Sequence, residues 1–214
     1  MIGADDEHPG RPVHDSGPHT KSRLLRLRHA VQTYVHNVRA DFELMREGRA
    51  KYLGDSIAED ALAGETLKRI GLQMMVAIRT MHLFRDAGFT TGAQVTSRLI
   101  RHVYAAEIHP ASRWSPGINI VHGNGLAVGS GAQIRHGCVL LHNVTLGDAF
   151  DKATGVIGGP TLGEHVHVGA GSTLLGPIHI GNNSKIQAGS TLSQSVPPGS
   201  LVRPAPVVVT QRDD

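Results

Sequence analysis

The chain has 214 residues, enough for one large domain or two small ones with a full hydrophobic core. Its formal charge of +3 is mild, and no basic stretch is interleaved with aromatic residues, which argues against nucleic-acid binding. A single cysteine, Cys138, excludes a disulfide framework and favours a reducing compartment. No apolar run approaches the roughly 18 residues of a membrane span, and no hydrophobic signal core is present. We therefore expect a cytoplasmic protein without a membrane partner.

The N-terminal half is predicted to be helical after a disordered lead-in. Residues 1–21 are rich in Pro, Gly, His and Asp, a composition typical of disorder. Apolar residues then recur at spacings of three and four over residues 22–47, 65–86 and 94–104. This periodicity predicts three amphipathic helices in a helical domain of residues 22–106.

From residue 107 onward the spacing of aliphatic residues changes to six. The repeated positions are Val128, Ile134, Leu140, Leu146, Leu162, Val168, Leu174, Ile180, Ile186 and Leu192. A period of six fits neither a helix nor an ordinary strand. It indicates hexapeptide repeats, in which each unit forms one flat face of a triangular coil and the inward side chains stack into one core. We predict an α+β protein: the helical domain, then a parallel β-helix over residues 107–204, then a tail over residues 205–214.

Two interruptions of the repeat stand out. The spacing before Val128 is eight residues instead of six, and the additional residues fall around His122 to Gly125. After Leu146, ten additional residues enter, so residues 147–160 are predicted to leave the coil as a flexible, glycine-rich loop. Insertions in solenoid proteins tend to lie on one face, often the binding face. The other histidines of the coil, His142 among them, fall between the aliphatic positions and are expected at the surface.

Short stretches around these interruptions carry the signature of a family. They are residues 107–110 (Glu-Ile-His-Pro), 122–125 (His-Gly-Asn-Gly), 144–147 (Val-Thr-Leu-Gly), 168–171 (Val-Gly-Ala-Gly), 196–199 (Val-Pro-Pro-Gly) and 77–82 in the helical part. In these stretches, and over about residues 41–206, the chain resembles the serine O-acetyltransferase family of hexapeptide-repeat acyltransferases. The resemblance implies a left-handed coil and transfer of an acetyl group from acetyl-CoA to a small hydroxyl or amine acceptor.

The resemblance also implies a catalytic pair, with His122 as general base and Glu107 as its partner. Acyl transfer from a thioester requires a group that takes the proton of the attacking hydroxyl, and histidine suits this role near neutral pH. A carboxylate behind the imidazole holds the required tautomer and stabilises the imidazolium that forms. The two residues are fifteen positions apart, close to one turn of an eighteen-residue coil, so they can lie on adjacent turns.

For the donor, the resemblance implies a groove between neighbouring coils of a homotrimer. Small side chains there let the pantetheine arm of acetyl-CoA approach the backbone. The corresponding positions are Gly147, Ala149, Ala170 and Ala188, with Lys185 near the CoA phosphates. A homotrimer is therefore expected, pairing of trimers into hexamers is left open, and no metal is expected.

The acceptor site departs from the family pattern. Val121 stands where the family has an aspartate before the base, and residues 157–160 (Ile-Gly-Gly-Pro) stand where it has an Arg-His pair. Without a guanidinium to pair with a carboxylate, recognition of a free amino acid is weakened. We therefore predict an acceptor other than free serine, with serine left open if the loop or a neighbouring subunit fills the gap. The candidate acceptor-contacting residues are Val121, Asp55, Asp60, Asp148, Gly158 and Gly159.

Three other interpretations are open. In the first, the acceptor is a sugar or polysaccharide precursor, because similar Gly-Gly-x-Pro loops without the Arg-His pair occur in polysaccharide-directed relatives. In the second, the coil is a non-catalytic scaffold. In the third, the protein is a zinc enzyme of the carbonic-anhydrase type, although His136 and His142 lie on adjacent faces of one turn and do not form the expected ligand set.

The acidic end, Gln211 to Asp214, differs from the isoleucine-ended tail that docks into the sulfhydrylase of cysteine synthesis in members of this family. That partnership is therefore not expected.

Overall fold

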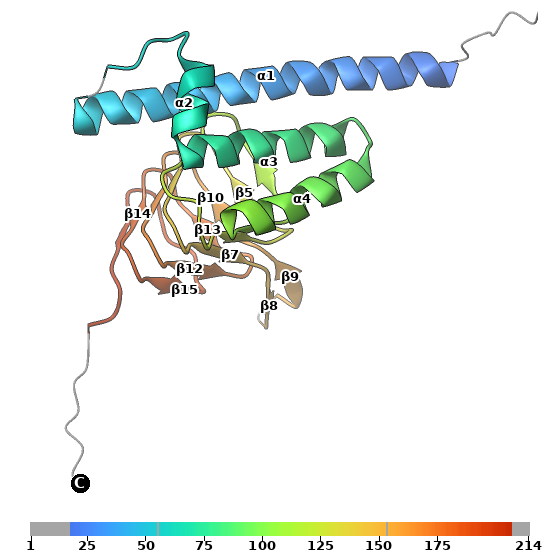
Figure 1. Ribbon diagram of the computed structural model, residues 1–214. Coiled ribbons are helices and arrows are strands. Elements are labelled where there is room, and N and C mark those ends of the chain that lie inside the picture. The colour runs from blue at the N-terminus through green and yellow to red at the C-terminus, as the bar shows by residue number, and fades with distance from the viewer. Residues whose placement is uncertain (1–17, 55, 153, 207–214) are drawn as a thin grey trace, which may run out of the picture.

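A layer of helices covers one end of a triangular coil of short parallel strands in the computed structural model (Figure 1). The structure describes residues 18–54, 56–152 and 154–206. The helices are α1 (Pro18–Leu53), α2 (Leu62–Lys68), α3 (Ile70–Asp86) and α4 (Thr90–Tyr104). None of the helices in these ranges combines the length and the apolar character needed to cross a bilayer.

Besides helix ends that differ by several residues, the helical layer differs from expectation in two places. Helix α1 begins at Pro18, inside the segment predicted to be disordered, since proline is favourable at the first helical position; residues 1–17 lie outside the described residues. The helix predicted over residues 65–86 is interrupted at Arg69, whose extended backbone (φ −118°, ψ 109°) separates α2 from α3. The interruption lets α2 run across the direction of α3 (Figure 1).

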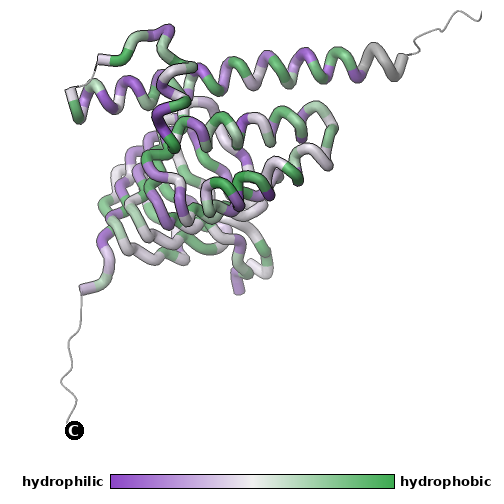
Figure 2. The backbone as a smooth tube through the Cα atoms, viewed as in Figure 1, coloured by the Kyte–Doolittle hydropathy of each residue, from purple (hydrophilic) through white to green (hydrophobic). Residues whose placement is uncertain are grey.

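Amphipathic patterning explains how the helices pack. Hydrophobic and hydrophilic residues alternate along α1 (Figure 2). On α1 the buried positions Val38, Phe42 and Met45 recur at spacings of four and three, which places them on one face. Helix α3 is the most enclosed of the four, with Met74, Ile78 and Met81 fully buried between its neighbours and the coil.

The coil has three faces, each a parallel sheet. The first face, β1-β4-β7-β12-β15, is formed by Glu107–Ile108, Ala127–Val128, Thr145–Gly147, Thr173–Leu175 and Thr191–Leu192. The second face, β2-β5-β10-β13, is formed by Arg113–Trp114, Gln133–Ile134, Thr161–Leu162 and His179–Ile180. The third face, β3-β6-β11-β14-β16, is formed by Asn119–Ile120, Val139–Leu140, His167–Val168, Lys185–Ile186 and Leu201–Val202.

The six-residue rhythm is confirmed by burial. Nearly every strand turns its first residue outward and its second inward. All ten aliphatic residues of the predicted repeat are buried, none with more than 5% of its surface exposed. Cys138 belongs to the same core and donates its S–H to the Gly163 carbonyl at 3.1 Å, while burial raises the pKa of its thiol to about 11. The thiol is therefore a core group and not a nucleophile.

The insertion is more ordered than the flexible loop that its glycines predicted. Strands β8 (Ala149–Asp151) and β9 (Val156–Gly158) form an antiparallel hairpin in which Phe150 faces Ile157. Cross-strand pairing of an aromatic and a β-branched residue stabilises such a ribbon. Gly155 closes the turn with φ 71°, a conformation that glycine adopts without strain.

A buried ion pair connects the helical layer to the coil. The Arg79 guanidinium on α3 donates to both carboxylate oxygens of Asp41 on α1, at 2.8 and 2.9 Å. It also donates to the carbonyls of Trp114 and Ser115, at 2.9 and 2.6 Å. Asp41 in turn accepts the backbone N–H of Ile118 at 2.9 Å. Two helices and the first turn of the coil therefore share one hydrogen-bond network.

Candidate active site

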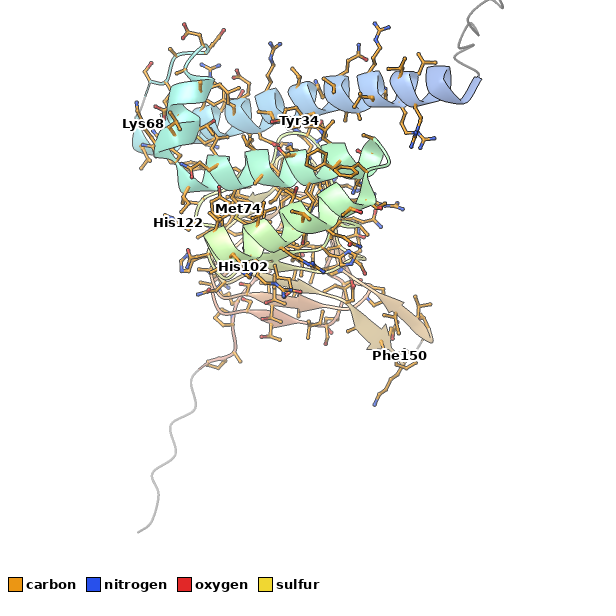
Figure 3. The ribbon with its side chains drawn as sticks, turned by 45° about the vertical axis from the view of Figure 1, so that its right-hand side comes forward. Tyr34, Lys68, Met74, His102, His122 and Phe150 are labelled. Carbon is orange, nitrogen blue, oxygen red and sulfur yellow. The ribbon has the colours of Figure 1, made fainter. Side chains whose placement is uncertain are left out.

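The turn after β3 carries His122 at the edge where the third face meets the first. Helix α3 packs directly on this turn: a Cβ at Gly71 would overlap the Ile120 carbonyl, and a Cβ at Gly123 would overlap the Met74 sulfur. Only glycine permits this approach of helix and backbone. His122 itself is exposed, and Figure 3 shows it near Met74 at the junction of helices and coil. The two additional residues predicted at this break thus form a turn held by α3.

His122 is the first of a column of residues along this edge. Strand register places Ile120, Leu140, Val168 and Ile186 side by side on the third face. The residues two positions later, His122, His142, Ala170 and Ala188, are therefore equivalent on successive turns. On the later turns backbone hydrogen bonds continue this register around the edge, from the Gly171 N–H to the His142 carbonyl at 3.0 Å and from the Gly189 N–H to the Ala170 carbonyl at 2.9 Å. On the first turn the corresponding bond runs from the Asn143 N–H to the Asn124 carbonyl at 2.9 Å, because the two additional residues enter between the strand and this point.

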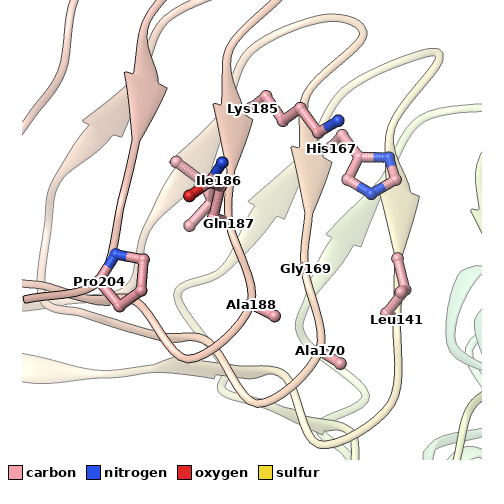
Figure 4. Close-up of a pocket in the computed structure, with 9 residues that line it drawn as sticks. All are labelled: Leu141, His167, Gly169, Ala170, Lys185, Ile186, Gln187, Ala188 and Pro204. Atoms are coloured by element: carbon pink, nitrogen blue, oxygen red, sulfur yellow. The ribbon is translucent and has the colours of Figure 1, made fainter. Parts of the chain in front are cut away.

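A groove of about 420 Å³ lies along the same column (Figure 4). Its lining residues are Leu141, His167, Gly169, Ala170, Lys185, Ile186, Gln187, Ala188 and Pro204. Lys185 and His167 occupy one side, and Ala170 and Ala188 the other, where they leave the backbone open (Figure 4). Burial, aided by the neighbouring Lys185 charge, lowers the pKa of His167, so Lys185 is the cation of this groove at neutral pH. Three of the five predicted donor-site residues therefore line one groove.

The remaining donor-site residues, Gly147 and Ala149, lie at a different edge, where the first face meets the second. Gly158 and Gly159 lie there too, at the foot of the hairpin. Figure 3 shows Phe150 projecting from this hairpin, away from His122. A single chain therefore brings the predicted residues together in two groups, on two edges of the coil.

Asp148 has a role that sequence reasoning missed. Its carboxylate accepts the N–H of Ser130 at 2.9 Å, the hydroxyl of Ser130 at 2.7 Å and the N–H of Gly131 at 3.0 Å. Burial opposes ionisation, but these hydrogen bonds together outweigh it and lower the pKa of Asp148. The side chain fastens the foot of the hairpin to the preceding turn, and its predicted contact with an acceptor stays a prediction.

Glu107 faces outward from β1, the first strand of the first face. Its carboxylate forms an ion pair with Arg101 on α4, with the Arg101 Nη2 and Glu107 Oε1 atoms 2.5 Å apart. No hydrogen bond joins Glu107 to His122 in the described part of the chain, so their partnership stays a prediction.

The residue directly before the candidate base is apolar. Val121 directly precedes His122, and 41% of its surface is exposed. Asp60 is exposed in the turn before α2, in the helical layer, and Asp55 lies outside the described residues. No group of three or more His, Cys, Asp or Glu side chains suited to a metal ion occurs within residues 18–54, 56–152 and 154–206.

His142 was expected at the surface but is partly buried beneath the candidate base. Its ring centroid lies 5.9 Å from that of His122, with an angle of 64° between the ring planes. Its Nδ1 atom is enclosed and has no hydrogen-bond partner among the described residues. A sequence signal was present, since His142 follows Leu140 by two residues as His122 follows Ile120.

Comparison with known proteins places these features in context. Residues 159–194 match the bacterial transferase hexapeptide family (six repeats). A serine acetyltransferase of Helicobacter pylori is 35% identical over 133 residues, which cover 61% of this chain and 75% of that protein. A serine acetyltransferase of Synechococcus elongatus is 38% identical over 130 residues, 59% of this chain but only 51% of that protein. The crystal structure of a Brucella abortus serine acetyltransferase in complex with coenzyme A is similar with a TM-score of 0.68 and 26% identity, over 84% of this chain and 68% of that one.

Proposed function

Because the chain belongs to the serine acetyltransferase family of acyltransferases, we propose that it transfers an acetyl group from acetyl-CoA to a small acceptor other than free serine. The observation that carries this proposal is the column of His122, Ala170 and Ala188 along one edge of a left-handed β-helix. It joins a base suited to acyl transfer to a groove with an open backbone and a cation.

The groove along this column has the features that a pantetheine arm requires. Ala170 and Ala188 have side chains small enough for the arm to approach the coil closely, and Lys185 offers a positive charge for the CoA phosphates. The Brucella abortus relative was crystallised with coenzyme A, which supports the same donor for this chain. The acetyl end of the donor would then point along the column toward His122.

In the proposed mechanism, His122 takes the proton of the acceptor hydroxyl as its oxygen attacks the thioester carbon. A base in this role typically contributes a factor of about 10² to 10⁴ to the rate. Glu107 is the proposed partner that holds the imidazole and stabilises the imidazolium. Its present pairing with Arg101 means that this carboxylate must change partner, or act on the base of a neighbouring subunit.

The side chains around the base indicate which chemical class of acceptor fits. The exposed apolar side chain of Val121 offers nothing to an ammonium group. Residues 157–160 (Ile-Gly-Gly-Pro) supply no guanidinium for a substrate carboxylate. An acceptor that carries a hydroxyl but no charged amino-acid pair therefore fits best. A sugar hydroxyl is the second candidate, favoured by the Gly158-Gly159 foot of the hairpin.

The test is thiol release from acetyl-CoA with a panel of acceptors that includes serine, homoserine, simple amines and sugars. We expect turnover with a non-serine acceptor, and loss of about 10²-fold or more in His122→Ala. The matched control is His136→Ala, another exposed coil histidine, whose Nδ1 lies 2.9 Å from the Pro116 carbonyl at a different edge. Robust serine turnover would overturn the acceptor proposal alone. Binding of CoA without turnover of any acceptor would favour a scaffold.

A further inference from the structure

His142 lies between the candidate base and the donor groove. It occupies the position equivalent to His122 on the next turn, and Leu141, directly before it, lines the groove. Ala170 continues the column on the far side. Provided that the proposed function holds, an acetyl group that reaches from the groove toward His122 must pass beside the His142 ring.

The burial of His142 distinguishes its two nitrogens. Nδ1 is enclosed without a partner among the described residues, whereas the side chain as a whole is only partly buried, so Nε2 is the open nitrogen. A hydrogen on Nδ1 would be an enclosed donor without an acceptor, the rarer and costlier arrangement in folded proteins. The favoured tautomer therefore carries its hydrogen on Nε2 and presents an N–H at the column.

We propose that His142 is a second catalytic residue, whose Nε2–H donates a hydrogen bond to the thioester oxygen in the transition state. As His122 takes the acceptor proton, the acceptor oxygen bonds to the thioester carbon, and the carbonyl π electrons move onto the carbonyl oxygen. His142 stabilises this charge, which is larger in the transition state than in the bound donor. When the carbonyl re-forms, the C–S bond breaks and the CoA thiolate takes the proton from His122.

Three variants of His142 test this role. His142→Phe keeps a ring but removes both nitrogens, His142→Gln places an amide N–H near the position of Nε2, and His142→Asn places one near Nδ1. For each variant we would measure kcat, KM for acetyl-CoA, the dissociation constant of CoA and the thermal unfolding midpoint. We expect kcat to fall about 10²- to 10³-fold in the Phe and Asn variants, with CoA affinity changed by less than about threefold. We expect the Gln variant to stay within about tenfold of wild type.

The outcomes separate this inference from the function on which it rests. Wild-type kcat in His142→Phe would overturn the inference, and so would equal losses in the Gln and Asn variants, which would assign His142 to packing. Loss of CoA affinity in parallel with kcat would make it a binding residue and would also overturn it. If His142→Phe does not fold, comparison of the Gln and Asn variants still tests the inference. If wild type has no turnover, or His122→Ala keeps it, the proposed function itself fails.

Discussion

Helix α3 can approach the His122 turn closely because residue 71 is a glycine and carries no Cβ. A Cβ there would overlap the Ile120 carbonyl oxygen and come within 3.0 Å of its carbonyl carbon. Neither atom can move without shifting the turn, so we expect Gly71→Ala to destabilise the fold by about 1–3 kcal/mol. Displacing the turn by about 1 Å would also lower kcat up to about 10²-fold. Thermal unfolding and steady-state kinetics measure the two effects.

A matched control for this substitution exists in α2. Gly64 is helical and exposed, and an added Cβ would meet no atom within 4 Å. Gly64→Ala should therefore be neutral or stabilise the helix by up to about 1 kcal/mol. If the two variants behave alike, Gly71 does not control the position of the turn.

Asp148 gives the foot of the hairpin a pH dependence. Because the folded-state pKa of Asp148 is lowered below its ordinary value of 3.8, its hydrogen bonds contribute stability that is fully present above pH 3.8. That contribution is lost as the pH falls through the lowered pKa. We expect Asp148→Asn to unfold at a lower temperature than wild type at pH 7, with the difference shrinking toward pH 2. Thermal unfolding from pH 7 to pH 2 tests this, with Ser130→Ala, which removes one of three donors, as a milder comparison.

At the level of single residues, some of the candidate site could be predicted and some could not. His122 was found because it sits in a break of the repeat, and Ala170 and Ala188 because they match a motif. The structural roles of Asp148 and His142 depend on which residues lie on adjacent turns. That neighbourhood is fixed by strand register across insertions of different length, which one sequence does not show directly.

At the level of elements, the Asp41–Arg79 pair fixes how α1 and α3 sit on the coil. Both side chains are only 1% exposed. Removing one partner leaves a buried charge, so we expect Asp41→Leu or Arg79→Met to cost about 3–5 kcal/mol in the free energy of unfolding. The double variant should cost less than the two single costs added together, because neither charge is then left alone. Urea denaturation of the three variants tests this.

The control for the buried pair is an ion pair on the surface of α1. Arg46 donates to Glu43 at 2.7 Å and lies 3.6 Å from Glu59, and these three side chains are 28%, 42% and 82% exposed. Exposed pairs contribute little because water screens them. Arg46→Met should therefore leave the unfolding curve nearly unchanged. If instead the losses of the Asp41 and Arg79 variants are additive, the two side chains do not stabilise the fold as one coupled pair.

The elements themselves were predictable in proportion to the strength of their periodicity. The six-residue spacing predicted every face of the coil after Val128, because one buried side chain per strand is enough to set the rhythm. The break at Arg69 was not predicted, because apolar spacing continues through it, with Leu67 before it and Ile70 directly after it. The hairpin was not predicted either, since its glycines indicate turns but not the pairing of Phe150 with Ile157.

At the level of the whole molecule, the two groups of predicted site residues would form one site only if a second copy of the chain brought them together. His122, Ala170 and Ala188 lie on the edge between the third and first faces, while Gly147 and Ala149 lie on the edge between the first and second. In a trimer with rotational symmetry, one edge of each subunit faces a different edge of its neighbour. The proposed homotrimer would thus complete each donor site from two chains.

This arrangement predicts that two inactive variants restore activity when mixed. His122→Ala removes the base on one edge, and Ala149→Trp blocks the other edge with a bulky side chain at a partly exposed position. If each site uses one edge from each of two subunits, trimers reassembled from equal amounts should regain about a quarter of wild-type activity, since about one site in four draws both intact edges. Thiol release after co-refolding, beside each variant refolded alone, measures this. Activity no higher than in the separate variants would mean that each site lies within one chain, or that Ala149 has no part in it. As a control, a Lys51→Ala chain, which is altered at the end of α1 and keeps both edges intact, should keep wild-type activity when refolded alone.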